Sequence, residues 1–236
     1  MKVVFLVFTL FFFNTLLGQN GLGSWNIINV TMGINNQWSV FSEGQLRSLS
    51  FYNQFHYYEI KSGVNYKLNS NFSFTTGFGS YNTYAPGGNF NTPMQQKEIR
   101  TWLQFNNKQS LKYFSIDHRY RAEQRFTTNG YRNRFRYRLG AIIPLNNTKV
   151  ETKTVYLSLW NELFFTNKEP FFERNRLFVG AGYQINKNTT IQSGYIYQFD
   201  YKINDEIGRD FFNIALLYNF DLNQIVPSNN PPSTTD

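Results

Sequence analysis

The chain of 236 residues contains no cysteine. That absence excludes a lipoprotein anchor, a thiolate metal site and a disulfide framework. It also suits passage through an oxidising compartment, where stray thiols would react. Histidine is scarce as well, with only His56 and His118. Two isolated imidazoles and no thiol give no metal-ligand set of recognisable spacing, so we predict no metal site and no cofactor.

Long hydrophobic runs are missing from most of the chain, whose mean hydropathy is -0.45. The one continuous apolar run extends from Val3 to Leu17, preceded by Lys2 and followed by Gly18. A positive start and an apolar run too short to span a bilayer comfortably are typical of a secretory signal peptide. We therefore predict a signal peptide over residues 1–18, with an N-terminal anchor helix as the alternative.

Aromatic residues, in contrast, make up 19% of the chain. In two neighbouring segments they alternate with charged residues, one by one. The charged positions are Asp117, Arg119, Arg121, Glu123, Arg125, Arg132, Arg134, Arg136 and Arg138. A helix would scatter both sets around its circumference, whereas a strand sends successive side chains to opposite faces. The pattern predicts two strands with one ionic face and one apolar face.

Such strands suit a barrel in a membrane. No soluble sandwich would bury this many arginines or expose this much aromatic surface, but a barrel with a polar interior and a lipid-facing exterior does both. Alternation also dilutes hydropathy in any averaging window, which agrees with the low mean value. We predict an all-β fold, an antiparallel transmembrane β-barrel of the cell outer membrane over residues 19–221, with a charged and largely filled lumen.

Turn signals divide the chain into hairpins. Short Asn-rich turns are expected at residues 33–37, 68–71, 106–109, 146–149 and 186–188. Asn suits tight turns because it tolerates the left-handed conformation and bonds its own backbone. Longer loops are expected near residues 48–52, 83–95, 127–130, 166–172 and 203–209. We predict that the short turns share one rim, the periplasmic one, and the longer loops share the other.

The strand count is less definite. Five intervals between turns give ten strands, and Ser24–Gly33 makes an eleventh. Bacterial single-chain barrels normally have an even number, so we predict ten to twelve strands.

The last strand has an aromatic end, with Phe212, Ile214, Leu216, Tyr218 and Phe220 on one face. Such an end resembles the terminal signal that barrel-assembly machinery recognises, and we expect that machinery as a partner during insertion. Residues 222–236 follow, with three prolines among Ser, Thr and Asn. We predict a disordered tail there.

Four stretches resemble a known family: residues 118–126, 131–138, 161–165 and 175–184. The family is the domain of unknown function 2490, small outer-membrane proteins common in Bacteroidetes-type bacteria. The resemblance covers about Gly23 to Phe220, and the arginine-rich hairpin is its most specific part. It implies an outer-membrane location and a barrel. It implies no reaction, so no catalytic residue can be carried over.

Catalytic constellations are weak in the sequence itself. His56 and His118 both share parity with the apolar side of their strands, where a histidine is more often an interfacial aromatic than a catalytic base. The nearest inner hydroxyl with an acid on the same face is Ser158, before Glu162, and no histidine joins them by parity. A base within reach of a nucleophile is required for an embedded hydrolase. We therefore predict that the protein is not an enzyme.

The charged lumen face admits two interpretations. In one, its arginines, with Arg174 and Arg176, form an interior ladder with Asp117, Glu123 and acids on facing strands. Those acids are expected to be Glu43, Glu59, Glu98 and Glu162. In the other, a ring of arginines lines an anion-selective constriction. We favour the ladder, because ten to twelve strands lie nearer the filled limit than the aqueous porins.

The function expected from the sequence is an outer-membrane barrel of non-enzymatic, structural or narrowly permeable character. The alternatives are a small anion-preferring channel and, less favoured, a membrane-embedded lipid-modifying hydrolase. Outer-membrane lipid is the expected partner. No nucleic-acid-binding motif accompanies the net charge of +8, so no nucleic acid is expected. The oligomeric state stays open.

Overall fold

The protein is an eleven-stranded closed barrel, described here from a computed structural model that covers residues 21–201 and 207–222. The strands are β1 (Leu22–Gly33), β2 (Trp38–Ser50), β3 (Asn53–Lys67), β4 (Phe72–Tyr84), β5 (Met94–Ser110), β6 (Ser115–Thr127), β7 (Gly130–Pro144), β8 (Val155–Thr166), β9 (Phe172–Gln184), β10 (Thr189–Asp200) and β11 (Ile207–Asp221). The predicted all-β barrel is confirmed, and its strand number falls within the predicted range. The predicted signal peptide and nearly all of the predicted tail lie outside the described residues.

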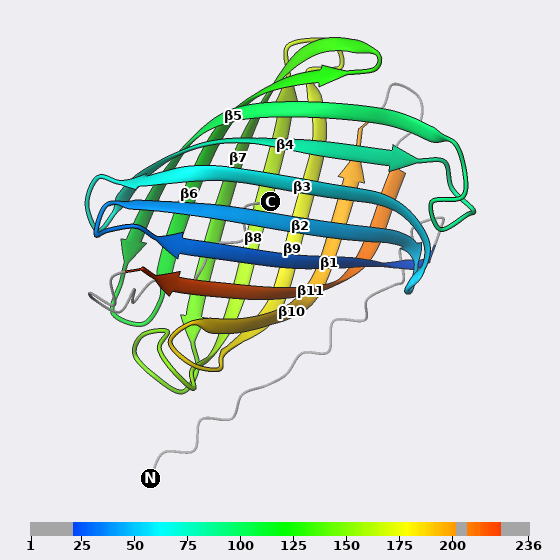
Figure 1. The fold of residues 1–236 in the computed structure, drawn as a ribbon. Coiled ribbons are helices and arrows are strands. Elements are labelled where there is room, and N and C mark those ends of the chain that lie inside the picture. Colours follow the sequence, from blue (N-terminus) through cyan, green and yellow to red (C-terminus); the bar gives the residue numbers. More distant parts are fainter. Residues whose placement is uncertain (1–20, 202–206, 223–236) are drawn as a thin grey trace.

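Figure 1 shows β1 to β5 crossing the front of the barrel while β6 to β10 run steeply behind them. Opposite walls of a barrel cross in this way because every strand is tilted from the barrel axis. Over the described ranges, no helix is long and apolar enough to cross a membrane.

An odd number of strands decides how the barrel closes. Every sequential pair is antiparallel, so the first and eleventh strands point the same way, and β1 pairs with β11 in parallel from Leu22↔Asp210 to Gly33↔Asp221. The segment expected at Ser24–Gly33 is thus a full wall strand, and no twelfth strand is required.

The connections fall on two rims. We name as rim A the end that carries the connections β1–β2, β3–β4, β5–β6, β7–β8 and β9–β10, and as rim B the opposite end. Short turns and longer loops do not segregate between the rims as expected. Rim A includes the connection of residues 145–154, whereas rim B includes the turns at residues 51–52 and 128–129.

One predicted turn is wrong outright. Asn106–Gln109 lies inside β5, and the turn comes at residues 111–114. The Asn106 amide Nδ2 donates to Ser73 Oγ at 3.1 Å on the neighbouring strand. The Asn106 side chain thus forms a hydrogen bond to the neighbouring strand instead of stabilising a turn. An Asn-rich stretch was therefore not sufficient to predict the position of the turn.

Strict alternation governs β6 and β7, where no register shift interrupts the pairing. Along these strands the arginines are buried, as with Arg119 at 2% exposure, and the rings between them are exposed, as with Phe135 at 52%. The charged residues therefore face the interior and the aromatic residues form the outer wall.

The interior is not charged throughout. One side, formed by β1 and β9–β11, holds an apolar cluster made of Trp25, Ile27, Phe178, Ile196, Phe211, Ala215 and Leu217. The last strand is therefore apolar on both faces, because Phe211 and Leu217 point inward between the outward residues that the sequence pattern singled out.

Glycines on the inner face make room for the rings that fill the barrel. A Cβ atom at Gly77 would lie 2.3 Å from Trp102 Cζ2, and one at Gly182 would lie 2.1 Å from Tyr156 Cζ. Each ring lies directly against the backbone of a neighbouring strand, which only glycine permits. Trp102 and Tyr156 are 3% and 0% exposed, so these glycines serve packing inside the lumen.

Candidate functional site: the arginine network

The charged interior is built around β6 and β7. Their register sets Arg119 opposite Arg138, Arg121 opposite Arg136, and Arg125 opposite Arg132. Like charges directly opposite one another are destabilising. Acids must therefore lie among these cations, on the same strands or on neighbouring ones. We name as the arginine network the arginines of this wall together with the acids that pair with them, Glu98, Arg100, Asp117, Arg119, Arg121, Glu123, Arg125, Arg132, Arg134, Arg136, Arg138, Glu162 and Glu173.

Arg136 links two acids at the centre of the network. Its Nη1 donates to Glu123 Oε1 at 2.9 Å, while its Nε and Nη2 donate to the two oxygens of Glu162, each at 2.9 Å. The same acids also bind other guanidinium groups, since Arg134 lies 2.6 Å from Glu123 and Arg119 lies 2.5 Å from Glu162. A fork of this kind is the strongest geometry for an arginine–carboxylate pair. It ties β6, β7 and β8 together across the interior.

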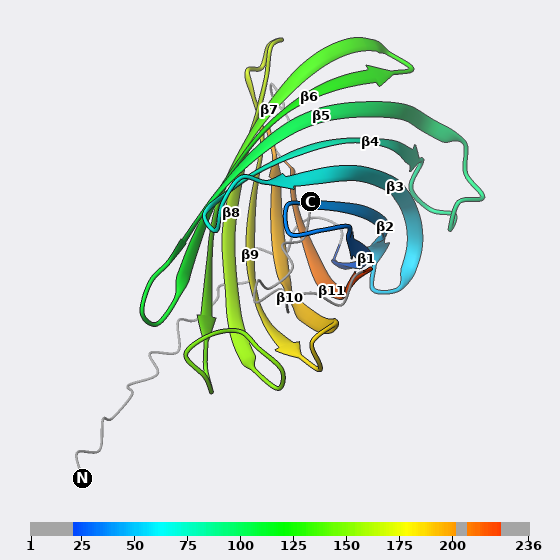
Figure 2. The same cartoon turned by 60° about the vertical axis from the view of Figure 1, so that its left-hand side comes forward.

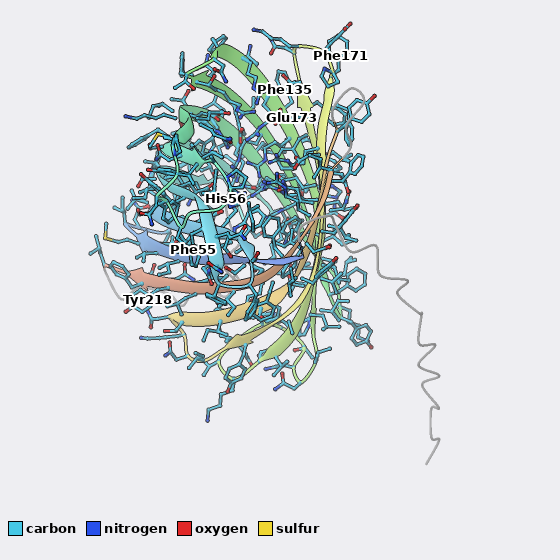
Figure 3. All side chains as sticks on the ribbon, turned by 90° about the vertical axis from the view of Figure 1, so that its right-hand side faces the viewer. Phe55, His56, Phe135, Phe171, Glu173 and Tyr218 are labelled. Carbon is cyan, nitrogen blue, oxygen red and sulfur yellow. The ribbon has the colours of Figure 1, made fainter. Side chains whose placement is uncertain are left out.

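A second pair of acids lies nearer rim B. Glu98 binds both Arg100 and Arg125, and Glu173 lies 3.2 Å from Arg125 and 3.3 Å from Arg134. Arg132 approaches Glu173 at 3.8 Å with its side chain 35% exposed. In Figure 3 the label of Glu173 lies below that of Phe171, which belongs to the β8–β9 connection on rim B. The network thus extends from a sealed centre to solvent at this rim.

One aromatic ring lies among the guanidinium groups. Phe164 is fully buried, and the guanidinium carbons of Arg136, Arg176 and Arg134 lie 4.6, 4.8 and 5.2 Å from its centroid. Cations over a ring face are stabilised by its quadrupole, more so when water is excluded. Phe164 shares parity with Glu162, so the alternation that located the acid could have located this ring as well.

The remaining predicted site residues bind partners at or just beyond the edges of the network. Arg138 lies 3.6 Å from Asp117, Arg121 Nε donates to Gln104 at 2.7 Å, and Arg176 Nε donates to Gln198 at 2.9 Å. Arg174 pairs with Asp200. All twelve predicted site residues lie on the inner-facing parity of β6–β9, which are consecutive strands of one wall.

A separate ionic group lies between β2 and β3. Lys61 Nζ is 2.7 Å from Glu43 and 2.8 Å from Glu59, and Arg47 is 3.2 Å from Glu59. The two acids were predicted as partners of the arginine-rich hairpin, but they pair here with Lys61 and Arg47, which the prediction left out. Arg47 also lies 3.4 Å above the ring of Trp25, so this group adjoins the apolar cluster.

The inward positions of two residues were not predicted, because β-bulges interrupt the alternation of inward and outward side chains. In β9 the register passes from Phe164↔Arg174 to Phe165↔Phe172, which leaves Glu173 as the extra residue. Strict parity would send its carboxylate outward, yet it pairs with inward arginines. A bulge turns the extra residue's side chain to the opposite face of the strand, and no residue type in the sequence predicts where the bulge occurs.

His56 is the extra residue of a second bulge, between Arg47↔Tyr57 and Ser48↔Phe55. The expectation that it faces outward with Tyr58 and Ile60 is wrong. It is 8% exposed, and its electrostatic neighbours are Arg47 and Arg209. His118 behaves as expected, with Nδ1 2.9 Å from the Tyr137 hydroxyl on the outer wall.

The chemistry available to this interior is electrostatic. Its groups are guanidinium ions, carboxylates and amides bonded to one another. Among the described residues, no group of three or more His, Asp or Glu side chains could hold a metal ion. What the arrangement does is cross-link strands and place many cations around few acids.

The sequence was compared with known families, curated proteins and solved structures. The model of the family described as "Protein of unknown function (DUF2490)" matches residues 22–208. The chain belongs to this family. The match spans β1 to the start of β11, so it includes the whole arginine network. Neither a curated protein nor a solved structure matches the chain.

Proposed function

We propose that the protein is an outer-membrane β-barrel whose interior is closed by its own ion pairs, with a structural, non-enzymatic role. The observation that carries the proposal is the distribution of side chains on the barrel wall. Charged side chains face the interior and apolar side chains face outward, the reverse of the arrangement in a soluble protein.

The outer face supports insertion into lipid. Leu103, Phe78 and Ile60 are 69%, 63% and 62% exposed, on three adjacent strands. Many further large apolar side chains are exposed around the wall, among them Ile28, Phe74, Phe126, Phe135, Leu177, Val179 and Ile191. A soluble monomer rarely exposes contiguous apolar surface on this scale, whereas a membrane barrel requires it.

The inner face supports a closed barrel. Glu123, Glu162, Arg119 and Arg136 are each at most 4% exposed, and all take part in ion pairs. Because the cost of burying a charge is offset only when partners are well placed, these groups hold one another in position across the lumen. Opening a path through the centre would require breaking several of these pairs together.

A narrow anion-preferring channel is the second candidate, and one observation favours it. On β5–β9 the inner basic residues outnumber the acids, which are Glu98, Asp117, Glu123, Glu162 and Glu173. A lipid-modifying hydrolase is less well supported, because His56 faces the interior and His118, on the outer wall, contacts the Tyr137 hydroxyl.

The test uses purified, refolded full-length protein in planar bilayers, with salt gradients to measure ion selectivity. We expect heat-modifiable migration on gels and no stable current. Stable anion-preferring currents that weaken in Arg134→Gln and Arg136→Gln, but not in the exposed control Lys149→Gln, would establish the channel instead. Recovery of the native protein in the soluble periplasm would contradict the membrane location itself.

A further inference from the structure

The outer wall carries a continuous row of aromatic rings. Trp38, Tyr66, Phe74, Phe105, Tyr120 and Tyr137 are consecutive partners in the register of β2–β7. Ring centroids are 4.6 Å apart for Trp38 and Tyr66, and 5.1 Å apart both for Phe74 and Phe105 and for Tyr120 and Tyr137. We name this set the aromatic row.

A second row runs beside it, two residues closer to rim B. Its consecutive partners are Val64, Thr76, Leu103, Ala122, Phe135 and Phe165, from β3 to β8. Three of its members, Val64, Thr76 and Ala122, are small. Together the two rows line a groove of about 670 Å³ in the outer wall, which we name the outer groove.

The outer groove climbs the wall from one rim to the other. It starts at Trp38, the first residue of β2 on rim A, and reaches Phe165, next to the end of β8 on rim B. Figure 2 shows β3 to β8 as consecutive strands of one curved wall. An interfacial aromatic girdle would follow the rim, so this path is a different feature. A groove that passes obliquely from rim to rim leaves room for an extended apolar chain along the outer wall.

We propose that the outer groove binds an acyl chain of an anionic phospholipid, with the headgroup phosphate near Lys67 at rim A. The inference rests on the proposed membrane location. A volume of 670 Å³ is within the range of ligand pockets, and the outward-facing side chains that line it carry no charge. An apolar chain is therefore the complementary ligand, and an empty groove would forfeit contacts on one side.

Charge complementarity selects the headgroup. Lys67 directly follows Tyr66 of the aromatic row, so its side chain starts on the inner side of the strand, but as the last residue of β3 it is exposed at rim A. Its long side chain can extend over the rim toward a headgroup. The exposed charged residues at rim A are Lys67, Lys112, Lys149, Lys153 and Lys187, against Glu151 and Asp221 among the residues described. A basic collar of this kind attracts anionic headgroups.

A second copy of the chain fits the outer groove less well. An isologous dimer places the same patch on both partners, so it would set one concave groove against another and leave a void between them. Between apolar surfaces in lipid, only close packing and polar contacts drive association. A flexible chain fills a concavity that a rigid copy does not.

The four tryptophans provide the assay. Trp38 is 43% exposed in the outer groove, whereas Trp25 and Trp102 are 1% and 3% exposed, and Trp160 packs against the apolar cluster. Phosphatidylglycerol with brominated chains is titrated into full-length protein in detergent. We expect saturable quenching of the Trp38 fluorescence at a low lipid-to-protein ratio, and a several-fold weaker effect with brominated phosphatidylcholine.

Matched variants separate the groove from the general lipid surface. Ala122→Phe fills the floor and should raise the half-saturating concentration roughly tenfold, as expected for about two lost methylene contacts. Ala181→Phe, on the exposed outer face of β9, should leave it unchanged. Lys67→Gln should abolish the preference for phosphatidylglycerol, whereas Lys187→Gln at the β9–β10 turn should preserve it.

Three results would overturn the inference. Quenching that rises linearly with lipid and is equal in Ala122→Phe and Ala181→Phe would mean that lipid only surrounds the barrel, while membrane insertion stands. A dimer that shields Trp38 from the brominated chains would assign the outer groove to a second copy. A protein that remains soluble without detergent would instead overturn the proposed function on which the inference rests.

Discussion

The two halves of the interior hold the barrel together by different means. The apolar cluster packs β1 against β9–β11, where the two ends of the sheet meet. The arginine network cross-links the wall farther from this seam, through directional bonds such as those from Arg136 to Glu123 and Glu162. Apolar packing tolerates small displacements, whereas a buried ion pair demands its partners. The seam between β1 and β11 is therefore stabilised by how well apolar side chains fill space, whereas the arginine network is stabilised by the positions of its hydrogen-bond partners.

Trp25 lies at the boundary between the halves. Its ring packs in the apolar cluster at an edge-to-face angle of 82° with Phe211, while Arg47 and Arg176 lie 3.4 and 4.7 Å from its centroid. Its Nε1 donates to Gln45 at 2.8 Å. One side chain therefore packs in the apolar cluster and also contacts inner arginines that lie outside the arginine network. The apolar cluster and the arginine network can accordingly be perturbed separately, by substitutions at other positions.

The largest effect is expected in the arginine network. Glu162→Gln keeps the shape of the side chain but removes the charge that Arg119 and Arg136 share. Because buried guanidinium groups would lose their counter-ion, the free energy of unfolding should fall by about 3–5 kcal/mol, measured by urea titration in lipid vesicles. Glu151→Gln in the exposed β7–β8 connection is the control. A change below about 1 kcal/mol would show that the ion pairs are dispensable.

A guanidinium on the opposite face of the same strand gives an intermediate effect. Tyr137 lies midway along β7 and points outward, next to the inward Arg136. Tyr137→Arg should cost about 2–4 kcal/mol if this part of the wall lies near the bilayer midplane. The same urea titration measures it, with Tyr137→Phe as the uncharged control. Equal stability of the two variants would place this face in water.

The smallest effect is expected in the apolar cluster. Ile196→Val removes one methylene from a side chain that is 2% exposed, next to the ring of Phe178. The cost should be about 0.5–1.5 kcal/mol, because the change is one of volume and leaves no charge exposed. The exposed Ile191→Val on the same strand is the control. A loss as large as that of Glu162→Gln would remove the distinction between the two halves.

The sequence predicted the barrel and the inner face of β6 and β7 because their alternation runs without interruption. Arg134 and Tyr137 could be assigned to opposite faces from parity alone. Parity failed for His56 and Glu173, where bulges insert an extra residue, and their positions depend on the register with neighbouring strands. Parity also could not assign the inner face where both faces of a strand are apolar, as at Leu217, because inward and outward residues then have the same polarity. The contact partners of each acid depend on strands distant in sequence, which no local pattern fixes.

Parallel closure has a consequence for how the ends can be used. β1 starts at rim B and β11 ends at rim A. A reporter attached before Leu22 and one attached after Asp221 would therefore lie at opposite rims of the barrel. Circular permutation would be correspondingly difficult. A peptide joining the two positions would have to span the twelve residues of β1, roughly 40 Å, where a hairpin turn suffices in an even-stranded barrel.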